Sequence, residues 1–152
     1  MIRIFTLSLL LSCIGLNGQD IQSPSNFLGY ELGTQFTRHH EVTDYFEHIS
    51  KAAPDRVKLV RYGNTYERRP LLLAYVSSAN NIKDLEHIRQ EHLKATKGAG
   101  NANKAIVWLS YNVHGNESVS TEASMKTIYE LLTKRHELLK NTVVIIDPCI
   151  NP

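Results

Sequence analysis

The chain has 152 residues, of which 42% are hydrophobic and 21% are charged. This length and composition fit one globular domain and exclude a disordered chain. The formal net charge is only +2, which excludes the strongly basic surface that nucleic-acid binding requires.

Residues 1–18 have the pattern of an export signal. Arg3 supplies a positive start, the run from Ile4 to Leu16 is nearly all apolar, and Gly18 is a small residue before a cleavage point. The apolar run is shorter than the roughly 20 residues that span a bilayer. We therefore expect an exported protein, periplasmic or extracellular, with no stable membrane span. Lipid attachment through Cys13, which follows a small residue, is the alternative.

The next segment, residues 19–36, is polar and is interrupted by one proline and two glycines, so we expect it to lie extended over the surface. From about His40 to Ala53, apolar residues then recur at spacings of three and four, and Pro54 follows. This spacing predicts an amphipathic helix that packs one face on the core.

The middle of the chain contains two strand-like runs and one polar helix. Val57 to Tyr62 and Leu71 to Ser77 are rich in valine, leucine and tyrosine, and a polar loop separates them, which predicts an antiparallel pair. Asp84 to about Lys94 has the pattern of a polar helix. The glycines and asparagines of Lys97 to Asn103 indicate a flexible connection.

The last third predicts a strand, a helix and a second strand. Ala105 to Tyr111 is mostly apolar, Val119 to Leu132 has a helical apolar stripe, and Thr142 to Asp147 is almost unbroken valine and isoleucine. Such a unit pairs its strands in parallel, and the lack of polar alternation predicts that both strands are covered on two faces. We therefore expect an α/β sandwich with a mixed sheet.

The loop between that first strand and the helix holds a candidate metal-binding pair. His114 and Glu117 lie three positions apart at the carboxyl end of a strand, the edge where open α/β sheets bind ligands. Imidazole and carboxylate are both zinc ligands, and Gly115 permits a tight turn between them. The alternative is a loop histidine without metal beside a glutamate that stabilises the first helical turn. The spacing alone does not decide between them.

Three ordered motifs together resemble the M14 family of zinc carboxypeptidases. Val107 to Glu117 and then Asn141 to Pro152 resemble the family's H-x-x-E pair and its later strand, which ends in N-P-D-G. Tyr62 to Leu71 resembles the strand and turn Y-G-x-S-x-E-G-R-P-L. Tyr30 to His40 resembles the opening of secreted bacterial members. The resemblance covers nearly all of residues 27–152.

The resemblance implies a fold, a metal and a reaction. The fold is a three-layer α/β sandwich with a mixed, largely parallel sheet, and residues 37–152 correspond to the N-terminal half of the catalytic domain. His114 and Glu117 are implied to be two ligands of one Zn²⁺ ion. A third ligand, a histidine, is expected beyond Pro152, as are the catalytic glutamate and the groups that hold the substrate's terminal carboxylate.

The implied activity is hydrolysis of C-terminal residues from peptides by metal-activated water. A chain that ends at Pro152 is expected to be inactive, to leave the strand Thr142 to Asp147 with an open hydrophobic edge, and to aggregate. Asn116 stands where digestive members carry arginine, so their detailed specificity does not transfer. The alternatives are a non-catalytic binding module on the same fold and a zinc acyl-amide hydrolase for small acylated amino acids. Export counts against the latter.

The remaining reactive side chains are interpreted as structural or solvated. If Cys13 leaves with the signal, Cys149 has no partner in the chain, so we expect a buried small hydrophobic residue or half of a bridge to residues outside it, rather than a nucleophile. Arg68 and Arg69 are expected to be solvated loop charges. The same is expected of the other histidines, which are His39, His40, His48, His87, His92 and His136.

Overall fold

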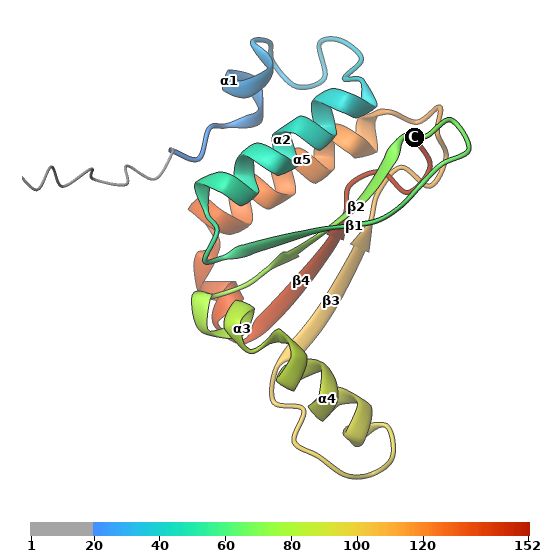
Figure 1. The fold of residues 1–152 in the computed structure, drawn as a ribbon. Helices are drawn as coiled ribbons and strands as arrows, with labels where there is room; N and C mark the ends of the chain where they lie inside the picture. Colours follow the sequence, from blue (N-terminus) through green and yellow to red (C-terminus); the bar gives the residue numbers. More distant parts are fainter. Residues whose placement is uncertain (1–19) are drawn as a thin grey trace, which may run out of the picture.

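A computed structural model describes residues 20–152, so the expected export signal and Cys13 lie outside the described residues. The described chain forms a four-stranded sheet with two long helices along one face (Figure 1). The strands are β1 (Val57–Asn64), β2 (Pro70–Val76), β3 (Ala105–Ser110) and β4 (Thr142–Asp147). The helices are α1 (Pro24–Leu28), α2 (His39–Ala52), α3 (Ala79–Lys83), α4 (Leu85–Ala95), α5 (Val119–Thr133) and the 3₁₀ helix η1 (His136–Lys140). Within residues 20–152, no helix has both the length and the apolar character that crossing a membrane requires.

The strand order is β1-β2-β4-β3, and the sheet is mixed, as predicted. β1 pairs antiparallel with β2, β2 pairs antiparallel with β4, and β3 pairs parallel with β4. Among the described strands, one pairing is therefore parallel and two are antiparallel. The physical reason is the length of the connections. A short loop joins β1 to β2 as a hairpin, and the crossover through α5 is long enough to bring β3 and β4 parallel.

The core lies between the sheet and the helices α2 and α5. Both helices bury the apolar stripes that their spacing predicted, and the strands contribute every second side chain on that face. The residues of this layer are at most 5% exposed, and they include Val42, Tyr45, Phe46, Ile49, Ala74, Val76, Met125, Ile128, Val144 and Ile146.

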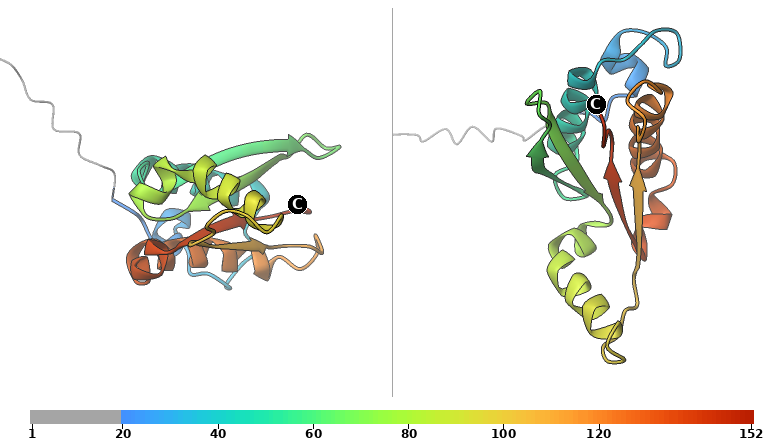
Figure 2. Two further views of the ribbon diagram at one scale, coloured as in Figure 1. Left: turned by 90° about the horizontal axis from the view of Figure 1, so that it is seen from below. Right: turned by 90° about the vertical axis from the view of Figure 1, so that its right-hand side faces the viewer.

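The opposite face of the sheet is largely open. α3 and α4 lie toward one end of the sheet, whereas α2 and α5 run along it (Figure 2). Ile106 is 39% exposed and Trp108 is 60% exposed, so the prediction that β3 is covered on two faces is wrong. The expected position of the open edge is wrong as well, because β4 lies between β2 and β3 and has partners on both sides. The edge strands are β1 and β3.

The N-terminal segment is not extended throughout. Pro24–Leu28 forms the short helix α1, which begins where Ser23 accepts a hydrogen bond from the amide of Asn26. Further along, the amide of Gly33 and the hydroxyl of Thr37 donate to the carboxylate of Glu122 at 2.5 and 2.7 Å. Glu122 is only 6% exposed, so this buried carboxylate on α5 fixes the segment before α2 against the helix that follows the candidate site.

Candidate metal-binding site

The candidate site lies at the carboxyl edge of the parallel strands. Ser110 at the end of β3 pairs with Asp147 at the end of β4, so the two chain segments leave the sheet side by side. Residues 111–118 lead from β3 into α5, and residues 148–152 follow β4. This is the edge of an α/β sheet at which ligands bind.

The structure brings together the two side chains that the sequence singled out. His114 Nδ1 lies 3.1 Å from Glu117 Oε2. A turn holds this spacing, because the amide of Glu117 donates to the carbonyl of His114 at 2.9 Å. Both side chains are open to solvent, with exposed fractions of 69% and 64%. The predicted convergence of these two residues is therefore present in the fold.

Imidazole and carboxylate are both zinc donors, and here the two groups lie at hydrogen-bond distance from each other. Two ligand atoms about 2.0–2.1 Å from a tetrahedral zinc ion lie about 3.4 Å apart. The separation of 3.1 Å between Nδ1 and Oε2 is close to that value. Residues 20–152 contain no group of three or more histidine, cysteine or acidic side chains that could enclose a metal ion. The described chain thus offers two converging donors and not a closed site.

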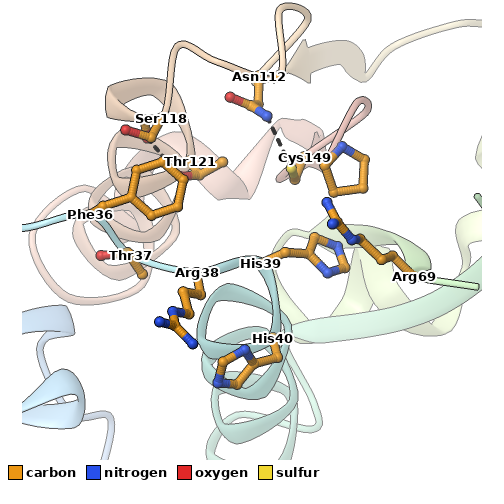
Figure 3. Close-up of a pocket in the computed structure, with 12 residues that line it drawn as sticks. Phe36, Thr37, Arg38, His39, His40, Arg69, Asn112, Ser118, Thr121 and Cys149 are labelled. Carbon is orange, nitrogen blue, oxygen red and sulfur yellow. Dashed lines mark hydrogen bonds between the residues drawn. The ribbon is translucent and has the colours of Figure 1, made fainter. Parts of the chain in front are cut away.

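A cavity of about 470 Å³ adjoins the metal loop, defined here as residues 112–118. Its walls come from both loops at the sheet edge and from the starts of α2 and β2. In Figure 3, Asn112 and Cys149 lie on one side of the cavity, and His39 lies beside Arg69 on another. His114 and Glu117 do not line it, because their side chains project into solvent.

Three histidines, His39, His48 and His92, are partly buried and so differ from the prediction that they are solvated. His39 is partly buried, and burial together with the neighbouring Arg69 guanidinium lowers its pKa. His48 is partly buried as well, because its ring packs against Phe27 with 5.3 Å between ring centroids. Arg69 itself is exposed, as predicted, and it pairs with Glu67 at 2.6 Å.

Cys149 is a buried residue, as predicted. Its side chain is 4% exposed, and it forms no disulfide within residues 20–152. Burial raises the pKa of this thiol to about 11, so it carries its proton at neutral pH and is a poor nucleophile.

Asp147 is a buried carboxyl that the sequence reasoning missed. It is 2% exposed, and its Oδ2 accepts a hydrogen bond from the Tyr62 hydroxyl at 2.8 Å. Its Oδ1 has no hydrogen-bond partner within the part of the chain that the structure describes. Burial raises the pKa of Asp147, while the bond from Tyr62 opposes that shift. The one signal in the sequence was an acidic residue ending an otherwise apolar strand.

Fold and site together define a mixed α/β protein with a histidine and a glutamate converging at the carboxyl edge of its sheet. Residues 42–152 match the family model described as zinc carboxypeptidase, peptidase family M14. Because the match covers most of the chain, the chain belongs to this family.

Solved carboxypeptidase structures share the fold. Carboxypeptidase A from Helicoverpa armigera aligns with a TM-score of 0.60 and 23% identity, over 78% of this chain and 25% of that one. Bovine thrombin-activatable fibrinolysis inhibitor, solved with tick carboxypeptidase inhibitor, aligns with a TM-score of 0.56 and 20% identity, over 77% of this chain and 31% of that one. A further structure of thrombin-activatable fibrinolysis inhibitor aligns with a TM-score of 0.55 and 21% identity, over 86% of this chain and 30% of that one. The chain thus spans less than a third of the length of these structures.

Proposed function

We propose that His114 and Glu117 are ligands of one zinc ion and that the protein is a metallocarboxypeptidase, which hydrolyses C-terminal residues from peptides. The observation that supports this most strongly is the 3.1 Å approach of Nδ1 and Oε2 at the carboxyl edge of the sheet. The second support is membership of the zinc carboxypeptidase family.

In this proposal the chain's own residues hold and present the metal. His114 donates through a neutral imidazole nitrogen and Glu117 through its carboxylate, and the turn between them keeps both donors on one side of the loop. A bound zinc ion polarises a carbonyl and lowers the pKa of a water molecule. Because both donors are open to solvent, an extended peptide has access to them.

We further propose that a third protein ligand and a general base come from residues after Pro152. Two protein donors bind zinc more weakly than a closed site, so a chain ending at Pro152 is expected to bind it weakly and to have no peptidase activity. We also propose that the protein acts after export, since residues 1–18 have the pattern of a signal.

Zinc titration tests the ligand assignment. In competition with a chromophoric chelator, His114→Ala and Glu117→Gln should each abolish the zinc binding of the wild-type chain. His136→Ala and Glu137→Gln are matched controls, because this second histidine–glutamate pair is exposed on η1 and should leave zinc affinity unchanged. Zinc affinity that survives in both His114→Ala and Glu117→Gln would refute the assignment.

Substrate assays test the reaction, with the protein that includes any residues encoded after Pro152. We expect it to release the last residue of a peptide with a free terminal carboxylate and to leave the same peptide with a terminal amide intact. Hydrolysis of an N-acyl amino acid in place of the peptide would support a zinc acyl-amide hydrolase. Zinc binding without hydrolysis of either substrate would support a non-catalytic binding module.

A further inference from the structure

Asn112, two residues before His114, has an unusual backbone conformation. Its φ of 55° lies in the left-handed region, which L-residues other than glycine, asparagine and aspartate seldom adopt. Its side chain is 4% exposed, although the loop around it is mostly open to solvent. Such outliers persist only where surrounding contacts hold them, and they are frequent at functional sites. The contacts that hold Asn112 are therefore informative.

The carboxamide of Asn112 connects three segments. Its Nδ2 donates to the carbonyl of Asn151 at 2.9 Å and to Cys149 Sγ at 3.3 Å, both in the loop after β4. Its Oδ1 accepts a hydrogen bond of 3.4 Å from Ser120 Oγ, in the first turn of α5. The amide of Asn151 donates back to the carbonyl of Asn112 at 3.2 Å. One buried side chain thus ties the start of the metal loop to the first turn of α5 and to the loop after β4.

The metal loop also packs closely against Asn151. A Cβ atom on Gly115 would lie 2.9 Å from the carbonyl oxygen of Asn151, a distance that real Cβ contacts essentially never show. Asn151 Nδ2 in turn donates to the carbonyl of Val113 at 3.2 Å. The loop that carries His114 and Glu117 therefore rests on a backbone that Asn112 holds in place.

We propose that Asn112 is a positioning residue for the His114–Glu117 pair. Its left-handed backbone turns the chain out of β3, and its carboxamide fixes the metal loop against residues 149–151. The two donors therefore lie close together before a metal ion binds, and the loop does not have to become ordered on binding. Asn112 bonds to neither donor and acts through the loop. That the ligand is zinc rests on the proposed function.

Zinc affinity is the first measurement. Asn112→Gly keeps the left-handed backbone accessible and removes the carboxamide, whereas Asn112→Ala removes both. We expect Asn112→Gly to weaken zinc binding by about 10- to 100-fold, as removal of groups that orient ligands commonly does, and Asn112→Ala to weaken it further. The matched control is Asn103→Gly, which deletes the same side chain from an exposed position outside the metal loop and should bind zinc like the wild type.

Amide hydrogen exchange of the metal-free chain is the second measurement. The amides of Glu117, Ile150 and Asn151 donate to the carbonyls of His114, Tyr111 and Asn112, and they report on the two loops directly. In Asn112→Gly these three amides should exchange faster, while the amides within β4 and α2 should keep their wild-type protection.

The two measurements separate this inference from the proposed function. If the wild type binds no zinc but the loop amides respond, the proposed function fails and the positioning role stands. If zinc affinity and loop exchange in Asn112→Gly both equal the wild type, the positioning role is overturned. It is also overturned if exchange rises equally throughout the chain, because Asn112 would then contribute only to overall stability.

Discussion

The two faces of the sheet differ sharply in how their side chains are covered. On the face under α2 and α5, Val76 and Ile146 are fully buried. On the other face, Val143 of β4 is 2% exposed, but Ile106 and Trp108 of the edge strand β3 are 39% and 60% exposed. A groove on that face is lined by residues of the strands and of α4.

The difference shows which half of the sandwich stabilises the described chain. Hydrophobic stabilisation scales with the apolar surface that is removed from water, so it is concentrated between the sheet and α2 and α5. The open face contributes less and exposes the edge of β3, whose backbone groups have a partner on one side only. Three predictions test this contrast.

The largest effect is expected from matched isoleucine substitutions on the two faces. Ile146→Ala removes a fully buried side chain and should lower the free energy of unfolding by about 2–5 kcal/mol. Ile106→Ala, from the neighbouring strand but the open face, should lower it by about 1 kcal/mol or less. Urea denaturation of both variants measures the difference, and equal losses would refute the contrast.

A smaller effect concerns Asp147, which lies at the end of β4 on the same side as Val143 and Ile145. Burial raises its pKa above 3.8, so the folded chain keeps this proton to a higher pH than the unfolded chain. Stability is therefore lost as pH rises from 3.8 through the folded pKa. Asp147→Asn should remove this loss, because the neutral amide still accepts from Tyr62 and carries no charge.

Denaturation of the wild type and Asp147→Asn over a series of pH values measures that loss. Asp55→Asn is the control, because Asp55 is exposed and its replacement should leave the pH profile unchanged. Parallel profiles for the wild type and Asp147→Asn would show that the buried carboxyl does not titrate in this range.

The smallest change in the free energy of unfolding is expected from a substitution on the edge strand β3. The same substitution should clearly change self-association. Trp108→Lys places a charge on β3 and should change the free energy of unfolding by no more than about 0.5 kcal/mol. It should nevertheless reduce self-association, because charged residues on edge strands oppose edge-to-edge pairing. Sedimentation velocity measures the association, and a wild-type chain that stays monomeric at high concentration would contradict the expectation.

Much of the site was predictable because its signals are local. A histidine and a glutamate three positions apart, just after an apolar strand, were expected to converge, and their donor atoms lie 3.1 Å apart. The residues that support them were not predictable in the same way. Asn112 was visible as part of the loop, but its left-handed backbone and its bonds to Cys149 and Asn151 span up to 39 positions along the chain. Glu122 binds Gly33 and Thr37 across more than 80 positions.

The sequence by itself determined α2, α4, α5 and the four strands, the parallel pairing of β3 with β4 and the place of the His114–Glu117 pair, because each follows from periodicity or from the length of a connection. The tertiary structure alone decided that β4 is central and β3 is an edge strand, that one face of β3 stays open, and that Asp147 and Glu122 are buried. The physical reason is that strand order and burial depend on contacts between segments far apart in the chain, which no local pattern records.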